Sequence, residues 1–273
     1  MAPRARLDAE LVRRGLAGSR QQAADLIADG RVAIRGVTAA KPATGVDRDA
    51  PLEVRESDEP TWASRGAHKL LGALAAFEPA GLTVAGRRCL DAGASTGGFT
   101  DVLLRHSAAE VVAVDVGYGQ LAWQLRTDPK VQVLDRTNVR HLTPDAIGGL
   151  VDLVVADLSF ISLRTVVPAL LQCTSPDGDL VPMVKPQFEV GRQRLGAGGV
   201  VRDPELRLAA LTEVAAAAHG LGLGVRDAVA SPLPGPSGNV EYFLWLRRAV
   251  GTEPAEVPDT AELLRRAVQE GPR

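Results

Sequence analysis

The sequence predicts an α/β fold in which a mostly parallel sheet of seven strands carries helices on both of its faces. From about residue 64 onward, short apolar runs alternate with helical segments, and this βαβα order is typical of parallel sheets. The first apolar run leads into a glycine-rich turn at residues 91–99, which opens a helix. A strand, a glycine turn and a helix in that order are typical of a crevice that binds a nucleotide.

The strands of this sheet are expected at seven apolar runs, with helices between most of them. The strands are expected at residues 88–91, 110–115, 130–134, 152–157, 180–185, 224–230 and 241–247. The helices are expected at residues 69–77, 97–106, 118–127, 163–172 and 204–219, and a glycine-rich loop at 191–201. Together these elements assign residues 64–250 to one large domain.

A small α+β domain is expected to precede the sheet, at residues 1–58. Residues 7–14 and 19–29 have the pattern of two short helices, the second with Ser19 as its N-cap. Residues 31–54 alternate polar and apolar side chains between glycines and prolines, which is typical of short hairpin strands.

Two further segments complete the predicted organisation. Residues 59–63 are expected to link the domains, because the surrounding segment is polar and contains Pro60. Residues 251–273 are expected to form a polar tail with one short helix at 260–270.

Charge is unevenly distributed along the chain. The whole chain has a net charge of −2. Residues 1–46 hold eight Lys or Arg and four Asp or Glu, which is a local charge of 8 − 4 = +4. The N-terminal domain is therefore a basic module on a mildly acidic body, and it is the part of the chain that is expected to contact a polyanion.

Composition excludes several classes of protein. The two cysteines, Cys89 and Cys173, lie near apolar runs with no Cys-x-x-Cys or His/Cys cluster, so buried thiols are expected and no metal site. The N-terminus lacks the apolar stretch of a signal peptide. No apolar run reaches the roughly 18 residues of a membrane span. We therefore expect a cytoplasmic protein, monomeric and without a membrane partner.

The glycine turn predicts an adenosine-type ligand. Asp115 ends the second strand 24 residues after Asp91 (115 − 91), close to the roughly 20-residue spacing of an acid that binds ribose hydroxyls. Ser95 stands where a dinucleotide site needs its second glycine, which disfavours a pyrophosphate ligand. Residues 93–97 also read as G-x-S-x-G, the nucleophile elbow of a hydrolase. A hydrolase also needs an oxyanion donor from a loop after an earlier strand. Since no strand of this domain clearly precedes the one at 88–91, and two strands still follow His219, a hydrolase is disfavoured.

Two of the four lysines, Lys69 and Lys185, are candidate catalytic residues. The chain has 31 Lys and Arg, but its only lysines are Lys41, Lys69, Lys130 and Lys185. Lysine, unlike arginine, can lose its proton near neutral pH. Lys185 and Asp157 each end an apolar strand, so in a parallel sheet both are placed in the ligand crevice. A structural ion pair at the edge of the sheet is the alternative interpretation.

A set of motifs in fixed order resembles the TlyA (hemolysin A) family. The motifs are Ser64-Arg65-Gly66-x-His68-Lys69-Leu70, Asp91-x-Gly93-x-Ser95-x-Gly97-Gly98-Phe99, Asp157-Leu-Ser-Phe-Ile-Ser162, Val184-Lys185-Pro-Gln-Phe-Glu189 and Asn239-x-Glu241-Tyr-Phe243. The resemblance covers about residues 4–248. It implies a Rossmann-like class I methyltransferase fold with an FtsJ-like catalytic domain, an N-terminal RNA-binding domain shared with a ribosomal protein, and S-adenosyl-L-methionine as cofactor.

The resemblance also implies an activity and its residues. The activity is 2′-O-methylation of cytidine ribose in ribosomal RNA of one or both subunits. The implied catalytic residues are Lys69, Asp157, Lys185 and Glu241, where Lys185 activates the hydroxyl and Glu241 holds Lys69 or the ribose. The expected cofactor residues are Asp91, Gly93, Ser95, Gly97, Gly98, Phe99, Asp115 and Asn138. The expected RNA-binding residues are Arg4, Arg6, Arg20, Arg31, Lys41 and Arg65.

The sequence departs from the family at one place and leaves two alternatives open. Residues 59–61 read Glu-Pro-Thr before Trp62, where related actinobacterial sequences carry a basic residue near the Trp. The first alternative is a non-catalytic RNA-binding or ribosome-assembly factor. The second is a membrane-damaging hemolysin, which the absence of a basic amphipathic helix disfavours.

Overall fold

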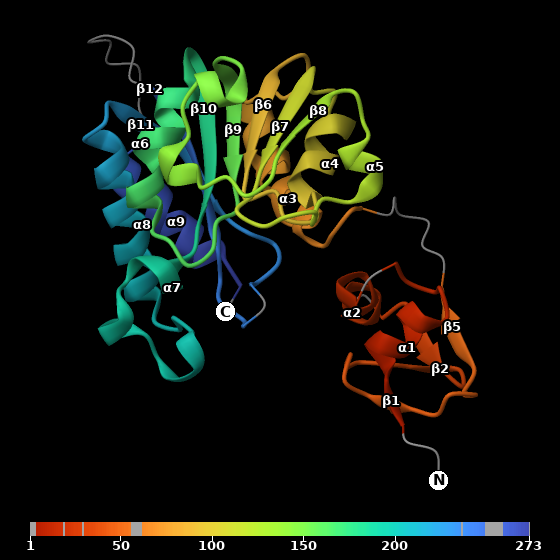
Figure 1. Cartoon of the computed structure of the whole chain (residues 1–273). Helices are drawn as coiled ribbons and strands as arrows, with labels where there is room; N and C mark the ends of the chain where they lie inside the picture. The colour runs from red at the N-terminus through yellow and green to blue at the C-terminus, as the bar shows by residue number, and fades with distance from the viewer. Residues whose placement is uncertain are drawn as a thin grey trace. The chain divides into compact units, whose positions relative to one another are not determined.

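The computed structural model describes residues 4–18, 20–28, 30–55, 62–235, 237–248 and 259–272. The chain divides into two compact units, Met1–Arg65 and Gly66–Arg273 (Figure 1). The expected N-cap Ser19, the helix end at Asp29, the linker residues 59–61 and tail residues 251–258 lie outside the described residues.

The N-terminal unit is a small α+β fold built on two short helices. Its elements are β1 (Ala5–Arg6), α1 (Leu7–Arg13), α2 (Arg20–Ala28), β2 (Val32–Ile34), β3 (Val37–Thr38), β4 (Gly45–Val46) and β5 (Leu52–Val54). The strands pair antiparallel as β3-β2-β5 and β1-β4. Apolar residues of both helices, among them Leu7, Leu11 and Ile27, pack on Val32 in one core. Burial of these side chains holds together elements that are each too short to be stable alone.

The larger unit is built on a seven-stranded sheet, as the sequence predicts. The strands are β6 (Arg88–Ala92), β7 (Glu110–Val114), β8 (Val131–Leu134), β9 (Val151–Ala156), β10 (Thr174–Val184), β11 (Leu223–Ala230) and β12 (Tyr242–Arg248). Their order is β11-β12-β10-β9-β6-β7-β8. Strands β6 to β10 pair in parallel, whereas β12 runs antiparallel to both β10 and β11. The mostly parallel α/β fold is thereby confirmed.

Helices cover both faces of the sheet (Figure 1). The helices are α3 (Gly66–Phe77), α4 (Gly98–Arg105), α5 (Trp123–Arg126), α6 (Leu163–Cys173), α7 (Pro186–Glu189), α8 (Pro204–His219) and α9 (Thr260–Glu270). Alternate residues of the strands, such as Leu90 and Val154, pack with α6, α8 and α9 in one large core. On the other face Phe77 of α3 contacts Trp245 and Phe99 of α4 contacts Phe243, with ring centroids 5.8 and 5.9 Å apart.

The structure differs from the sequence prediction at three loops. The helix expected at 118–127 forms only as the single turn α5, because Gly119 has a φ of +66° and Ala122 is extended. The glycine-rich segment 191–201 contains two 3₁₀ turns, Arg192–Arg194 and Ala197–Gly199. The one-turn helix α7 follows β10 directly and was not predicted, since four residues are too few to show a helical period.

The C-terminal helix α9 packs more closely than the expected polar tail suggests. Its Leu263, Leu264 and Ala267 are buried and belong to the core that covers one face of the sheet. Asp259 caps the helix by accepting a hydrogen bond from the Ala261 N–H at 3.0 Å. Three buried apolar residues on one side of a polar helix are enough to anchor it to the core. Among the described helices, none is long and apolar enough to cross a membrane.

Candidate functional site

Four strands bring functional side chains to one edge of the sheet. Strands β6, β9 and β10 end at this edge, and β12 begins there, because Ala92 pairs with Ala156, Pro182 with Ala156 and Val184 with Tyr242. Asp157 follows β9, Lys185 follows β10 and Glu241 precedes β12. Since neighbouring residues of a strand point to opposite faces, these three residues continue on the face that α3 and α4 cover.

The predicted catalytic residues form two ion pairs at this edge. The Nζ of Lys185 lies 2.5 Å from Oδ1 of Asp157 and donates to Oγ of Ser159 at 3.0 Å. The Nζ of Lys69, in the first turns of α3, lies 2.6 Å from Oε2 of Glu241. The side chains of the two lysines and Glu241 are exposed by 11% or less, whereas that of Asp157 is 24% exposed. Each lysine therefore has one carboxylate at contact distance, in surroundings that exclude most water.

The glycine turn passes close to the catalytic edge. Gly93 has a φ of +89°, and a Cβ built on it would lie 2.5 Å from the backbone oxygen of Asp157. The turn continues through Ser95, with a φ of +48°, to Gly97, which caps α4 in the left-handed region. The absence of a side chain at Gly93 is therefore what lets the loops after β6 and β9 approach each other.

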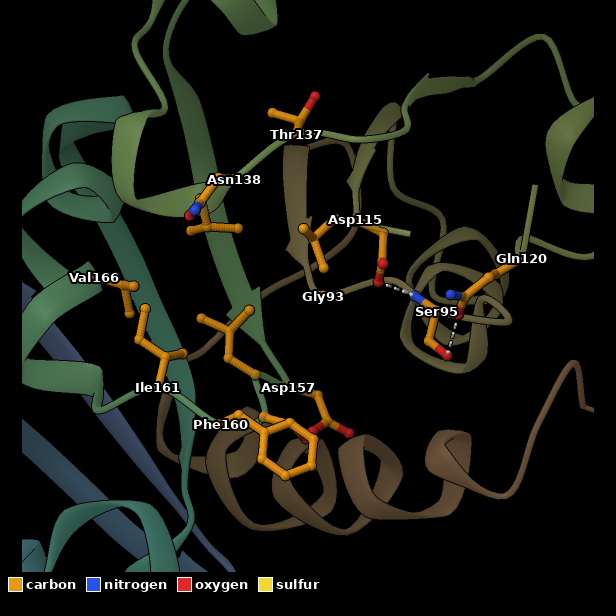
Figure 2. A pocket seen from close by; sticks show the side chains of 14 residues that line it. Gly93, Ser95, Asp115, Gln120, Thr137, Asn138, Asp157, Phe160, Ile161 and Val166 are labelled. Carbon is orange, nitrogen blue, oxygen red and sulfur yellow. Dashed lines mark hydrogen bonds between the residues drawn. The ribbon is translucent and has the colours of Figure 1, made fainter. Parts of the chain in front are cut away.

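A cavity of about 460 Å³ opens beside the turn and the catalytic edge (Figure 2). Four of the expected cofactor residues line it, namely Gly93, Ser95, Asp115 and Asn138, and Asp157 lines it too. The sequence analysis did not single out nine further lining residues: Val116, Gln120, Thr137, Val139, Leu158, Ser159, Phe160, Ile161 and Val166. The motif 157–162 contains four of these, so it was the signal that could have found them. The others lie in loops without a recognisable pattern.

Two backbone N–H groups orient the side chain of Asp115. Its Oδ2 accepts from the N–H of Ser95 at 2.8 Å (Figure 2), and its Oδ1 accepts from the N–H of Gly117 at 2.7 Å. A carboxylate has about four lone-pair sites, so two remain for a ligand. Asn138 uses its side-chain oxygen to cap a 3₁₀ turn through the N–H of Arg140. The hydroxyl of Ser95 lies 3.4 Å from Oε1 of Gln120, and the cavity holds no histidine that would form a hydrolase triad among the described residues.

Four other expected cofactor residues support the turn and do not line the cavity. Gly97, Gly98 and Phe99 form the start of α4, and Phe99 is buried against Phe243. Asp91 is fully buried, and its Oδ2 accepts from the hydroxyl of Thr100 at 2.6 Å. Among the described residues, its Oδ1 has no hydrogen-bond partner. Burial raises the pKa of Asp91 to about 7.

Replacing Asp91 by asparagine is expected to remove a pH dependence of stability. The pKa of about 7 in the folded chain lies above the value of about 4 for an unfolded chain. The wild-type group therefore stabilises most below pH about 4, and this contribution is lost as the pH rises to about 7. The free energy of unfolding of the variant, relative to wild type, should rise by up to about 4 kcal/mol over that range. Urea denaturation at several pH values measures it, with the exposed Asp177→Asn as control; parallel curves would refute the expectation.

Replacing Gly93 by alanine is expected to destabilise the chain more than the same change at Gly86. Both glycines have a positive φ, but nothing lies within 4 Å of a Cβ at Gly86. Gly86→Ala should cost about 1–2 kcal/mol for the left-handed backbone, whereas Gly93→Ala adds about 1–3 kcal/mol for the collision with Asp157. Thermal and urea unfolding compare the two variants, and equal losses would show that the loops separate freely.

The expected RNA-binding residues lie in the N-terminal unit, and several are paired. Arg6 and Arg20 both contact Asp8, at 2.9 and 3.0 Å, and the hydrogen bond from Arg6 is the largest cause that lowers the pKa of Asp8 to about 2. Arg4 lies 3.2 Å from Asp47. The remaining positions are Arg31, which donates to the backbone oxygen of Arg55, and the exposed Lys41 and Arg65. The guanidinium groups of Arg4, Arg6 and Arg20 remain at least half exposed, so they stay accessible to an anion.

Comparisons with known proteins agree with this architecture. Residues 62–248 match the FtsJ-like methyltransferase family, and residues 5–50 match the S4 domain. The chain is 63% identical, over 100% of both chains, to the 16S/23S rRNA (cytidine-2′-O)-methyltransferase TlyA of Mycobacterium tuberculosis. It is 34% identical to Hemolysin A of Brachyspira hyodysenteriae, over 87% of this chain and 98% of that protein.

A solved structure shares both units. A protein of Streptococcus thermophilus that carries the name hemolysin is 36% identical, with a TM-score of 0.75 over 99% of this chain and 98% of that one. The matches extend over the full length of this chain, and the identities are well above 30%. The chain therefore belongs to the TlyA (hemolysin A) family, in which an S4 domain precedes an FtsJ-like methyltransferase domain.

Proposed function

We propose that the chain transfers a methyl group from S-adenosyl-L-methionine to the 2′-hydroxyl of a cytidine ribose in ribosomal RNA. The relative at 63% identity carries the name of such an enzyme, and the larger unit matches methyltransferases. The observation that carries the proposal is the placement of Asp157. It holds Nζ of Lys185 at 2.5 Å and at the same time lines the cavity beside the glycine turn. The residue that contacts the proposed proton acceptor Lys185 is therefore also part of the wall of the ligand cavity.

The residues around the cavity suit S-adenosyl-L-methionine. A volume of about 460 Å³ is in the range of small-ligand pockets. Gly93 presents backbone without a side chain to the ligand, and the carboxylate of Asp115 is held by two N–H groups with lone pairs left over. Asp115 would bind the ribose hydroxyls and Asn138 would contact the adenine. When bound, the cofactor supplies a methyl group on a sulfonium, which is electrophilic.

Lys185 is the residue that takes the proton from the substrate. A ribose hydroxyl is a weak nucleophile, so it needs a base within hydrogen-bond reach. In its amine form Lys185 would accept the 2′-hydroxyl proton on Nζ, while that oxygen would take the methyl group that the bound cofactor supplies. Asp157 and Ser159 orient the amine through contacts of 2.5 and 3.0 Å. Much of the rate enhancement then comes from the positions of the reacting atoms.

Glu241, just before the neighbouring strand β12, and Lys69 of α3 support the reaction. The pair is buried, and among the described residues Oε1 of Glu241 has no hydrogen-bond partner. An unsatisfied buried acceptor is costly, so this oxygen is suited to accept a hydrogen bond from a ribose hydroxyl. A Cβ on Gly235 would lie 2.5 Å from the same oxygen, which indicates how closely the loop before β12 surrounds it.

The substrate is proposed to reach the site as part of a ribosomal subunit or its RNA. The S4 domain supplies arginine side chains, among them Arg4, Arg6 and Arg20, that would contact phosphates without reading sequence. The chain is proposed to act as a monomer in the cytoplasm, where ribosomal subunits are present.

Methyl transfer to unmodified ribosomal subunits tests the proposal. The purified chain, tritiated S-adenosylmethionine and subunits lacking the modification should yield a methyl group at a cytidine 2′-oxygen, located by mass mapping of the RNA. Binding of subunits without transfer would instead indicate an assembly factor. Leakage of liposomes in the absence of cofactor would indicate a membrane-active protein, and either outcome would overturn the proposal.

A further inference from the structure

Glu189 is a buried carboxylate outside the two catalytic ion pairs. Its side chain is 1% exposed. Its Oε2 accepts from the hydroxyl of Ser162 at 2.5 Å, and its Oε1 accepts from the N–H of Leu163 at 2.7 Å. Nε of Arg164 lies 3.4 Å from Oε2. All three partners belong to the start of α6, so Glu189 ties its own segment to the N-terminus of that helix.

The two segments that Glu189 joins are the ones that carry the catalytic contact. Residues 157–162 connect β9 to α6 and include Asp157 and Ser159, and this loop forms a wall of the cavity. Residues 185–189 connect β10 to the segment before α8 and begin with Lys185. The contact of Lys185 with Asp157 and Ser159 lies at one end of this pair of segments. Glu189 closes the other end.

The backbone between Lys185 and Glu189 is restricted by a proline and by one turn of helix. Lys185 is the N-cap of α7, Pro186 occupies its first position, and the N–H of Phe188 donates to the backbone oxygen of Lys185 at 2.9 Å. The proline ring restricts φ at the start of such a turn. The rings of Phe160 and Phe188 also contact each other, with centroids 5.3 Å apart. A displacement of Glu189 is therefore transmitted to Lys185 through one turn of helix.

Electrostatics explains why the carboxylate remains in place although it is buried. It accepts from an O–H and from a backbone N–H at the N-terminus of α6, a helix of 11 residues whose dipole favours a negative charge there. The guanidinium of Arg164 contacts two carboxylates. Its Nε lies 3.4 Å from Oε2 of Glu189, and its Nη1 lies 2.9 Å from Oε2 of Glu213. A glutamine at position 189 could accept from the N–H of Leu163 through its oxygen, but its NH₂ group would then face the hydroxyl of Ser162. That hydroxyl oxygen already accepts from the N–H and Nε of Arg164, so the second short hydrogen bond would be lost.

We propose that Glu189 is a positioning residue that holds Lys185 against Asp157 and Ser159 by locking the turn after β10 to the start of α6. The inference rests on the proposed function, because Lys185 acts on the substrate only in that reaction. Glu189 is not among the described residues that line the cavity. Its removal is expected to act on the catalytic contact through α7 and the loop 157–162.

Single-turnover methyl transfer by Glu189→Gln tests this role. The rate constant per active molecule should fall about 10- to 100-fold, because small misplacements of reacting groups cost up to that much. The pH profile of the rate should shift as well, because Lys185 would no longer be held at contact distance from Asp157. A purely structural role would lower the melting temperature and the active fraction, with the rate constant and its pH profile unchanged.

The matched control is Glu213→Gln, which removes the other carboxylate on Arg164. Glu213 is 35% exposed and contacts no residue of the loop 157–162 other than through that arginine. Its rate should stay within about twofold of wild type, in line with the small effects of exposed ion pairs. If Glu189→Gln does not fold, Ser162→Ala is the second variant. It removes the 2.5 Å hydrogen bond to Glu189, together with the two 3.2 Å bonds that the Ser162 hydroxyl oxygen accepts from the N–H and Nε of Arg164. It should show the same shift in pH profile. If the wild-type chain is active and the pH profile of the variant is unchanged, this inference alone is wrong. If the wild-type chain is inactive, the proposed function is wrong.

Discussion

Replacing Lys185 by arginine is expected to lower the rate of methyl transfer by about 10²- to 10⁴-fold, the usual contribution of a general base. Arginine keeps a positive charge opposite Asp157, so the buried pair, now 2.5 Å apart, is not left with an isolated carboxylate. A guanidinium does not lose its proton in proteins. The change therefore removes the proton acceptor and leaves the charge. Single-turnover transfer of a tritiated methyl group to ribosomal subunits measures the rate.

The controls for this variant separate chemistry from folding and binding. Calorimetric affinity for S-adenosylmethionine should stay close to that of wild type, because Lys185 does not line the cavity. Lys130→Arg makes the same exchange at an exposed lysine beside the edge strand β8, and it should leave the rate unchanged. If Lys185→Arg retained more than about a third of the wild-type rate, the loss would be far smaller than that expected for removal of a general base. Lys185 would then not be the proton acceptor.

Breaking the Lys69–Glu241 pair is expected to lower the free energy of unfolding by about 3–5 kcal/mol. Glu241→Leu leaves the ammonium of Lys69, whose side chain is 11% exposed, without the carboxylate that contacts it at 2.6 Å. Removing one partner of a buried pair destabilises the folded chain, because the remaining charge is desolvated and no longer has a partner of opposite charge. Urea denaturation measures the loss, and the same samples report methyl transfer.

The double variant Lys69→Met/Glu241→Leu distinguishes stability from catalysis. Replacing both charges by apolar side chains should restore most of the lost stability, since no buried charge is left unpaired. Methyl transfer should remain at the level of the weaker single variant, because Glu241 is proposed to bind a ribose hydroxyl and Lys69 is its partner at 2.6 Å. Recovered activity in the double variant would show that the pair is structural. Additive losses of stability would show that the two charges do not interact.

Local patterns in the sequence predicted most of the elements of the larger unit. The strand from 224 to 230 was predicted within one residue of β11, and α8 at its observed bounds. Asp203 caps α8 and Pro204 occupies its first position, which are start signals that a sequence carries by itself. The helix expected at 118–127 was wrong in most of its length. Its apolar residues have a helical spacing, but the chain must first leave β7 through Gly117 and Gly119.

The site was predictable in kind and less so in detail. The ends of β9 and β10 place Asp157 and Lys185 at one edge, and strand alternation is enough to infer that. Glu241 had two expected partners, Lys69 or the ribose, and the structure shows the contact with Lys69 across 172 positions of chain. Asp91 and Phe99 were expected in the cofactor site, yet they face the interior. A sequence motif contains both the residues that line the cavity and the residues that support the turn, and it does not distinguish the two groups.

The sequence by itself determined the order of strands and helices, the glycine turn, the basic N-terminal module and the family. These depend on hydrogen bonds, steric limits and side-chain periods within a few residues. Only the tertiary structure decided the antiparallel place of β12 between β10 and β11, the packing of α9 and the contact of Glu189 with α6. Each of these joins residues distant in the chain. Their contact depends on which apolar faces are buried together and which buried charges find a partner, and no local pattern records that.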